Sequence, residues 1–404
     1  MRSELLADLV TSVEVSVEIN LLLNQISQEN RPFAVWKLPE HNTIHLIAAS
    51  SSEAQQHQKI DLEALPAGFV AAPFNTTHGI YFIPANEHWA WQLTPHFQKG
   101  IRTKGLAPLL PSKETLVAPL SVLHLENYLT STKVTGDNSV GFQQAVRAAI
   151  AAIQKHAFQK VVLSRQKIAP LPSQFSPVAT FLKLCRLYPT AFVSFFAIPK
   201  AGVWMGASPE VLVSVEQNRI FRTMALAGTQ VKGSLENLQH ATWTQKEIAE
   251  QAMVSRYIIN CFKKIRLREF EENGPRTVAA GNLIHLRTDF EVDMLAVNFP
   301  QLGTVMLELL HPTSAVCGLP KEPAAEFITR YETYDRALYS GYIGGVNIDN
   351  DSHLFVNLRC MQLQTNHLIM YAGAGITEDS EPAKEWQETE IKCQTMFDVI
   401  NPQR

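Results

Sequence analysis

The sequence predicts an α+β fold with mainly antiparallel β-sheets. Strand-like segments come in runs, at residues 192–227 and again at 354–376, and only short connections separate them. Gln217-Asn218 fits a hairpin turn between two of these segments. Helical patterns lie between the runs instead of alternating with single strands, which disfavours a doubly wound parallel sheet.

The spacing of apolar residues indicates where the helices and strands lie. An apolar stripe at every third or fourth position predicts a helix over residues 139–153. Three more helices are expected at residues 4–28, 244–270 and 383–400. The expected strands are KVVLSRQKIA (160–169), FVSFFAI (192–198), VWMGAS (203–208), VLVSVE (211–216), RIFRTMALA (219–227), LFVNLRCMQL (354–363) and LIMYAGAGI (368–376).

The composition excludes several classes of protein. The 404 residues are 46% hydrophobic and 18% charged, which suffices for one large domain or two ordinary ones. A formal net charge of −3 offers no bulk attraction to nucleic-acid phosphates, so we expect no nucleic-acid partner. Five scattered cysteines without a CxxC pair indicate neither a disulfide framework nor a zinc site.

The chain also lacks the apolar segments that a membrane or secreted protein needs. No stretch approaches the roughly 20 apolar residues that span a bilayer. Acidic residues interrupt the N-terminal segment, unlike the apolar core of a secretion signal. We therefore expect a cytoplasmic protein with no membrane partner.

Two of the expected helices each carry a pair of acidic residues on one face. Glu247 and Glu250 lie three positions apart, and Glu385 and Glu388 repeat that spacing. Either pair alone is typical of a solvated helix face, and Thr244 with Glu247 also fits a helix capping box. If the two helices face each other, four carboxylates converge and fit a hard cation. Mg²⁺ is the expected ion when a substrate carboxylate completes its ligands.

Nine segments occur in the same order as in a known family. They are KVVLSR (160–165), GASPEVLV (206–213), ALAGT (225–229), KEIAEQAMV (246–254), LHPTSAVCGLPK (310–321), YDRALYSGYIGG (334–345), NLRC (357–360), AGAGI (372–376) and EWQETEIKCQTM (385–396). With them the chain resembles the chorismate-utilising enzymes, which include isochorismate, salicylate, anthranilate and aminodeoxychorismate synthases. The resemblance implies two large stacked antiparallel β-sheets flanked by helices, with an active site in the cleft. It also implies a catalytic domain at residues 135–400 and a variable N-terminal part, residues 1–130, packed into the same body.

The resemblance assigns roles in binding the metal ion and the substrate. Glu250 and Glu388 match direct Mg²⁺ ligands, whereas Glu247 and Glu385 match acids that act mainly through water. Chorismate is a dianion, which cations and exposed backbone amides bind. The matching substrate contacts are the cations Arg359 and Lys392, a turn at Gly373, Ala374 and Gly375, the ring neighbours Gly228, Thr229 and His285, and the wall residues Ala315 and Val316. Taken singly, a strand arginine, a Gly-Ala-Gly turn and a lone histidine are all common structural features.

Two further positions, Lys160 and Ala227, distinguish the chemistries within the family, and a third, Glu210, carries a catalytic role. Lys160 stands where ammonia-using members usually carry glutamine, and water, unlike ammonia, must lose a proton as it attacks C2. A neutral lysine amine takes that proton, so we expect burial or a nearby cation to favour the uncharged form of Lys160. Glu210 matches the general acid that protonates the leaving C4 hydroxyl, which requires a raised pKa. Ala227 disfavours aminodeoxychorismate synthase, which typically has a nucleophilic lysine there.

These residues favour an Mg²⁺-dependent isochorismate synthase that feeds menaquinone or siderophore biosynthesis. Salicylate synthase, which also eliminates pyruvate, is the nearest alternative, and a non-catalytic chorismate-binding protein is an alternative of another class. The sequence contains neither an LLES-type tryptophan-binding motif nor a glutaminase domain, so no glutamine amidotransferase partner is expected. A monomer is expected for this branch of the family.

Overall fold

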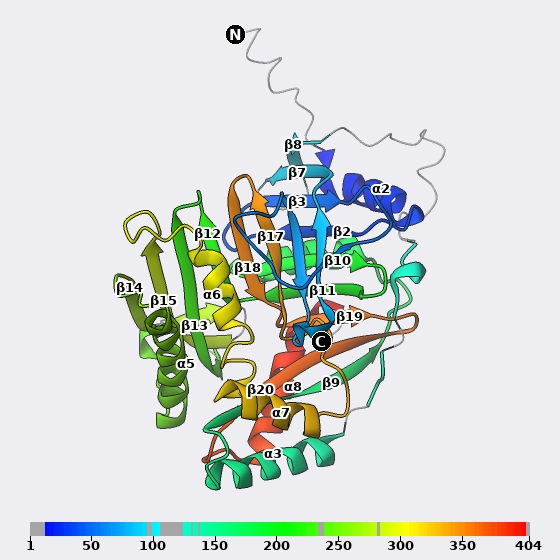
Figure 1. The fold of residues 1–404 in the computed structure, drawn as a ribbon. Helices are drawn as coiled ribbons and strands as arrows, with labels where there is room; N and C mark the ends of the chain where they lie inside the picture. Colours follow the sequence, from blue (N-terminus) through cyan, green and yellow to red (C-terminus); the bar gives the residue numbers. More distant parts are fainter. Residues whose placement is uncertain are drawn as a thin grey trace.

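Two large antiparallel sheets form the body of the protein (Figure 1). The computed structural model describes residues 13–94, 99–105, 124–130, 132–135, 138–232, 238–280 and 283–400. Within these ranges one sheet has 11 strands, the other has nine, and every strand pairing in both is antiparallel. The predicted α+β class with two large antiparallel sheets is confirmed.

The spatial order of the strands differs from their order in the sequence. The 11-stranded sheet consists, from edge to edge, of β1 (Val13–Glu14), β8 (Lys99–Lys104), β7 (Glu87–Leu93), β3 (Thr43–Ala48), β2 (Phe33–Lys37), β10 (Phe192–Ile198), β11 (Gly202–Ser208), β19 (Cys360–Leu363), β20 (His367–Ile376), β9 (Lys160–Pro170) and β16 (Gly318–Leu319). The nine-stranded sheet consists of β14 (Glu271–Ala280), β15 (Leu283–Asp293), β13 (Ile220–Val231), β12 (Val211–Glu216), β18 (Asp351–Val356), β17 (Tyr342–Ile348), β5 (Gly68–Ala72), β6 (Ile80–Pro84) and β4 (Gln55–His57).

The N-terminal part of the chain contributes strands to both sheets. In the larger sheet β2 pairs with β10, and in the smaller sheet β5 pairs with β17. The two sheets pack against each other through a buried apolar cluster, in which the rings of Phe192 and Phe355 stack at 4.2 Å between centroids. The described N-terminal strands therefore share the core of the later ones, whereas the domain boundary near residue 130 stays a prediction.

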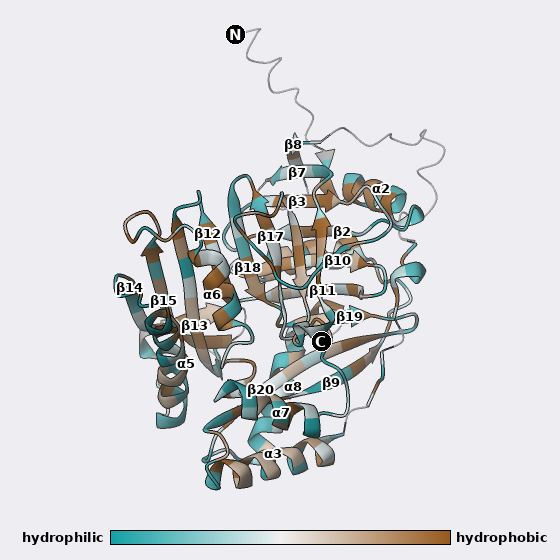
Figure 2. Cartoon of the chain, viewed as in Figure 1, coloured by the Kyte–Doolittle hydropathy of each residue, from teal (hydrophilic) through white to brown (hydrophobic). Residues whose placement is uncertain are grey.

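Helices cover the outer faces of the two sheets. They are α2 (Val15–Gln28), α3 (Ser139–Gln154), α4 (Pro177–Leu187), α5 (Gln245–Lys264), α6 (Leu302–Leu310), α7 (Lys321–Tyr331) and α8 (Pro382–Ile400). The larger sheet buries apolar residues of α2, α4 and α8, and the smaller sheet buries those of α5 and α6. Figure 2 shows hydrophobic residues along the strands of both sheets and hydrophilic ones in many of the loops. No helix within the described ranges is long and apolar enough to cross a membrane.

Two helix boundaries differ from the expected ones. The long helix α5 ends at Lys264 and does not continue to residue 270, because Arg266 takes a left-handed conformation (φ 60°) and the Leu267 N–H bonds back to the Phe262 carbonyl. The helix expected from residue 4 begins at Val15 in the structure, and residues 1–12 lie outside the described ranges. The expected hairpin turn at Gln217-Asn218 is confirmed between β12 and β13.

The segment LFVNLRCMQL, expected as one strand, forms two strands in different sheets. β18 ends at Val356 in the smaller sheet, and β19 begins at Cys360 in the larger one. The linking residues are held by reciprocal backbone hydrogen bonds of Asn357 with Ser340 and Gly341, and Arg359 has a left-handed φ of 48°. The expectation of a single strand was wrong because the chain crosses between sheets at this point, which places Arg359 at the junction.

The expected turn at Gly373, Ala374 and Gly375 is also wrong. These residues lie inside β20, where they pair in regular antiparallel register with Ser164, Leu163 and Val162 of β9. Alternating small residues in an otherwise apolar strand resemble a turn in sequence, but the ten-residue pairing with β9 keeps the backbone extended.

A buried ion pair ties the segment after α6 to β9. The Arg336 guanidinium donates to the carbonyls of Val316 (2.8 Å) and Val162 (2.7 Å), and both its Nε and Nη2 bond to the Glu332 carboxylate. The side chains of Arg336 and Glu332 are only 2% and 5% exposed. The Glu332 carboxylate also accepts a hydrogen bond from the Ser164 N–H of β9 at 2.7 Å. This ion pair thus fixes the position of Val316 relative to β9.

We predict that Arg336→Met destabilises the fold by about 3–5 kcal/mol, because it leaves the buried Glu332 carboxylate without its cation. The midpoint of urea unfolding, followed by far-ultraviolet circular dichroism, measures the change. Arg219→Met is the matched control, since it breaks the solvent-exposed pair with Asp293 and should leave the midpoint nearly unchanged. Equal midpoints for the two variants would contradict a structural role for the buried pair.

Candidate active site

One cleft brings together most of the residues that the sequence singled out. It holds about 720 Å³ of open space and is lined from β9, β13, β15 and β20, from α5 and α8, and from connecting segments. Twelve of the predicted residues line it: Glu210, Gly228, Thr229, Glu250, His285, Ala315, Val316, Arg359, Gly373, Gly375, Glu388 and Lys392. The other four, Lys160, Glu247, Ala374 and Glu385, do not line the cleft.

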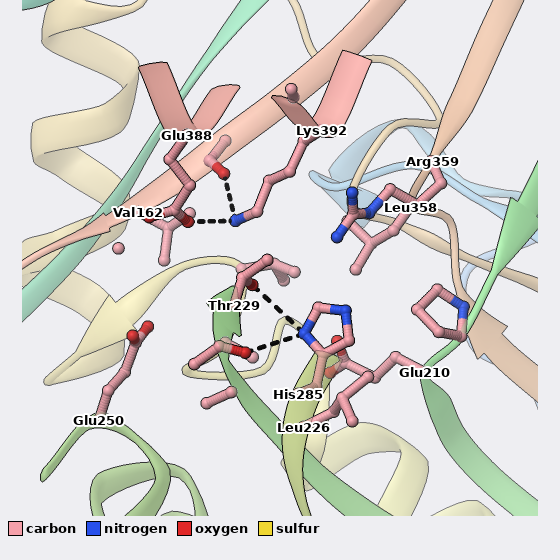
Figure 3. A pocket seen from close by; sticks show the side chains of 18 of the residues that line it. Val162, Glu210, Leu226, Thr229, Glu250, His285, Leu358, Arg359, Glu388 and Lys392 are labelled. Atoms are coloured by element: carbon pink, nitrogen blue, oxygen red, sulfur yellow. Dashed lines mark hydrogen bonds and ion pairs between the residues drawn. The ribbon is translucent and has the colours of Figure 1, made fainter. Parts of the chain in front are cut away.

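Figure 3 shows how the charged groups are arranged in the cleft. Glu388 and Lys392 of α8 approach it from one side and Glu250 of α5 from another. Arg359, Glu210 and His285 lie on the opposite side of the view from Glu250. The sequence reasoning missed two aromatic wall residues, Tyr339 and Tyr371, although both lie in or beside the segments that carried the family resemblance.

The unpaired edge of β20 presents backbone groups to the cleft. β20 pairs with β9 along its length but with β19 only through residues 368–370, so residues 371–376 have no second strand partner within the described ranges. The Gly373 carbonyl accepts a hydrogen bond from Lys392 Nζ at 2.9 Å, so it points away from β9. In an antiparallel strand the N–H and C=O of one residue point to the same side, as do those of the residue two positions later. The N–H groups of Gly373 and Gly375 therefore face this edge.

Glycine at position 375 is required by the close approach of two side chains. A Cβ atom there would lie 2.5 Å from Glu250 Oε1 and 2.9 Å from Lys160 Cε. The binding of a substrate carboxylate by these amides stays a prediction, but it now depends on an open strand edge and not on a turn.

Lys160 lies behind the cleft wall as the first residue of β9. Its side chain is fully buried, and Nζ lies 2.7 Å from Glu250 Oε1. Burial is the largest single effect and alone would raise the pKa of Glu250, but Lys160, together with Lys392 and Lys246, outweighs it and the net shift is downward. The neighbour of Lys160 is therefore an anion and not the cation that the sequence analysis offered as one alternative, and the neutral amine stays a prediction.

Glu210 lies in the link between β11 and β12, and its side chain is buried. Burial raises its pKa to about 8, although Lys160 and Lys392 act in the opposite direction. No ion pair to Glu210 occurs among the described residues. The carboxyl therefore carries a proton at neutral pH, as a general acid must.

His285 of β15 lies beside a bulge in β13. The pairing register of the two strands shifts between Ala227 and Gln230, and Gly228 takes a left-handed φ of 67°. His285 Nδ1 is 2.8 Å from the Gly228 carbonyl, which only accepts, so Nδ1 carries the hydrogen. Burial, with a contribution from Arg359, lowers the pKa of His285 to about 3. The imidazole is thus neutral, and Nε2, which has no hydrogen-bond partner within the described ranges, is an acceptor.

Two cations from different elements face the cleft. Arg359 is partly buried at the crossover between the sheets, desolvation lowers its pKa, and its buried Nη1 has no hydrogen-bond partner among the described residues. Lys392 of α8 donates to Glu388 Oε1 at 2.5 Å and to the Gly373 carbonyl. A buried donor without an acceptor is costly unless a ligand supplies one, so Arg359 fits a carboxylate of the substrate.

The four acids on α5 and α8 do not converge on one point. Glu247 closes the predicted capping box, accepting from the Thr244 N–H (2.7 Å) and from Gln230 Nε2 (2.9 Å). Glu385, 1% exposed, pairs with Lys246 Nζ at 2.5 Å. The described residues contain no group of three or more acid, histidine or cysteine side chains that fits a metal ion. The expected convergence was wrong because each carboxylate bonds to its own lysine or helix cap.

The donor set still fits Mg²⁺ when a substrate supplies further ligands. Mg²⁺ is usually bound by only one or two protein carboxylates, with water and substrate oxygens completing the octahedron. Glu250 and Glu388 both line the cleft and provide carboxylate oxygens. Each is paired with a lysine ammonium, with which Mg²⁺ would compete for the carboxylate oxygens.

Comparison with known proteins agrees with these features. The family model described as chorismate binding enzyme matches residues 112–401. Isochorismate synthase EntC of Escherichia coli K12 is 29% identical over 264 residues, covering 64% of this chain and 66% of the relative. Isochorismate synthase MenF of the same strain is 27% identical over 281 residues, covering 69% of this chain and 63% of that relative. The aligned regions thus span just under two thirds of the length of these relatives.

A solved structure shares the fold over nearly the whole chain. It is the putative 2,3-dihydroxybenzoate-specific isochorismate synthase DhbC from Bacillus anthracis, with a TM-score of 0.71 at 21% identity. The superposition covers 94% of this chain and 99% of that one. Because the family model spans well over half of the sequence, this chain belongs to the chorismate-binding enzyme family.

Proposed function

We propose that this protein is an isochorismate synthase, which converts chorismate to isochorismate with the help of Mg²⁺. The observation that carries the proposal is the buried Glu210 carboxyl, which has no ion pair among the described residues and lies in the same cleft as Glu250, the partner of Lys160. The reaction moves a hydroxyl group from C4 to C2 of the ring, so it needs one proton donor and one proton acceptor. The names of the similar proteins support the same activity.

Substrate binding follows from the charges of the cleft. Chorismate carries two carboxylates, and the cleft offers Arg359, Lys392 and the amides on the edge of β20. Charge-assisted hydrogen bonds from these groups would hold both carboxylates and orient the ring. The neutral His285 would accept a hydrogen bond through Nε2 from a substrate hydroxyl.

The proposed proton transfers balance within the reaction. Neutral Lys160 takes a proton from the water whose oxygen bonds to C2, the ring double bonds shift, and the C4–O bond breaks. Glu210 gives its proton to that leaving hydroxyl, which departs as water, and one proton then returns from Lys160 to Glu210 through solvent. Glu250 and Glu388 would hold Mg²⁺, which supplies positive charge to the ring carboxylate.

Product analysis tests this function directly. Purified protein is incubated with chorismate, with and without Mg²⁺ and ammonium, and the products are separated by chromatography. We expect isochorismate only when Mg²⁺ is present, without release of pyruvate. Salicylate with an equal amount of pyruvate would select a salicylate synthase, an aminated product would select an ammonia-using enzyme, and unchanged chorismate would leave a binding protein.

We predict that Glu210→Gln lowers kcat by about 10²–10⁴-fold, since the amide has the same shape but no acidic proton. Because the pKa of Glu210 is about 8, the protonated fraction falls as the pH rises through 8, and kcat/KM of the wild type should decline there. Steady-state kinetics between pH 6 and 10 measure both effects. Above its pKa, the protonated fraction of Glu210, and with it kcat/KM, should fall roughly tenfold for each pH unit. A variant with wild-type kcat would remove Glu210 from the role of acid.

Lys160→Ala should lower kcat by a comparable factor of about 10²–10⁴, because it removes the amine that is proposed to take the proton from water. Because the substitution leaves a cavity where the buried Lys160 side chain was, circular dichroism is needed to show that the variant still folds. Lys59→Ala is the control, since Lys59 is 77% exposed and pairs only with Glu308 among the described residues. Equal turnover by the two variants would show that Lys160 takes no proton.

A further inference from the structure

Lys246 is a cation beside the cleft for which the proposed reaction has no use. It lies in the first turn of α5, and its side chain is 30% exposed while its partner Glu385 is 1% exposed. Its ammonium is 2.5 Å from Glu385 Oε1 and also interacts electrostatically with Glu388 and Glu250. A single ammonium thus pairs with one of the four acids that the sequence assigned to the metal ion and acts electrostatically on two more.

The charges around these acids balance without a metal ion. Glu250 pairs with Lys160, Glu388 with Lys392, and Glu385 with Lys246. Three ammonium groups therefore neutralise three carboxylates. The first two lysines have proposed roles toward water and substrate, whereas Lys246 does not line the cleft. Its positive charge is therefore the part of this balance that has no proposed role toward water or substrate.

We propose that Lys246 is a tethered counter-cation that neutralises the acidic cluster of the metal-free enzyme and thereby lowers its affinity for Mg²⁺. The proposal rests on the proposed use of Mg²⁺ at this site. Lysine suits the task because its compact ammonium sits on a flexible four-carbon chain and is strongly hydrated once it returns to water. The 30% exposure of Lys246 gives it that path to solvent.

The same balance couples the metal ion to the substrate. Mg²⁺ alone adds two positive charges to a neutral cluster, and the chorismate dianion alone adds two negative charges to it. Both together restore neutrality and leave the lysines free to contact the substrate. The metal ion and the substrate should therefore each increase the affinity for the other, which is a reciprocal effect by linkage. Lys246 strengthens this coupling because it weakens binding of the metal ion alone.

Calorimetric titration of the purified enzyme with Mg²⁺ alone tests the proposal. Lys246→Gln should bind Mg²⁺ at least about tenfold more tightly than the wild type, because a unit charge a few ångströms away has been removed. Lys246→Arg keeps the charge and should keep the wild-type Kd. Lys384→Gln is the matched control on α8, since it removes the cation from the exposed pair with Glu381. An unchanged Kd for Lys246→Gln, or no saturable binding by either Lys246 variant, would overturn the proposal.

Thermal unfolding gives a second readout that requires no turnover. In a chelator, Lys246→Gln should have a lower Tm than the wild type, because the buried Glu385 carboxylate loses its partner. Added Mg²⁺ should raise the Tm of this variant more than that of the wild type, and equal rises would contradict the proposal. If the Kd values differ as expected but chorismate is not converted, the role of Lys246 stands and the proposed reaction fails. If isochorismate forms but the Kd values are equal, the proposed reaction stands and the role of Lys246 fails.

Discussion

The site depends on the fact that β20 has two strand partners for only part of its length. Residues 368–370 lie between β9 and β19, whereas residues 371–376 pair only with β9 within the described ranges. β19 cannot continue beside β20 because the chain crosses to the other sheet at Arg359. The same crossover therefore leaves the edge of β20 unpaired and places the partly buried Arg359 guanidinium beside it. Lys392 bonds to this edge through the Gly373 carbonyl, which joins α8 to the cleft.

Charge pairing across separate elements holds the walls of the cleft at fixed distances. Lys160 of β9 pairs with Glu250 of α5, and Lys246 of α5 pairs with Glu385 of α8. Each buried charge would be costly alone, and each pair joins two elements that belong to different parts of the fold. The small size of position 375 is part of this arrangement, since a side chain there would separate Lys160 from Glu250. The site is thus stabilised by the same groups that would perform its chemistry.

Much of this fold follows from sequence patterns, and the failures share one cause. Apolar periodicity located the long helix α5 and the terminal helix α8, and runs of strand-like segments predicted antiparallel sheets. Periodicity failed at LFVNLRCMQL, where the apolar pattern continues although the chain changes sheets at Arg359. It failed again at Gly373 and Gly375, whose missing side chains make room for Glu250 and Lys160 and do not form a turn. Both errors concern contacts between distant segments, which local patterns do not contain.

The candidate site was predictable as a set of residues but not as a set of contacts. The acid spacing on two helices and the family resemblance together selected residues that the fold gathers in one cleft. The sequence did not predict which acid pairs with which cation, because the partners are far apart in the chain. Glu385 pairs with Lys246, 139 positions away, and Glu250 pairs with Lys160, 90 positions away. Lys246 was overlooked for the same reason, since a lysine at a helix start is ordinary until the fold places it among acids.

Two buried carboxylates in this cleft show how neighbours decide chemistry. Burial acts on Glu210 and Glu250 in the same direction, toward a higher pKa. Glu210 has no ion pair among the described residues and its pKa rises to about 8, whereas Lys160 at 2.7 Å brings the pKa of Glu250 down. The difference follows from the cations around Glu250, where Lys160 adds a hydrogen bond to its charge and Lys392 and Lys246 contribute further. The place of Lys160 is set by backbone pairing, because it begins β9 opposite Leu319 of β16. The strand register of the larger sheet thus places the lysine that helps to keep Glu250 an anionic ligand while Glu210 remains a proton donor.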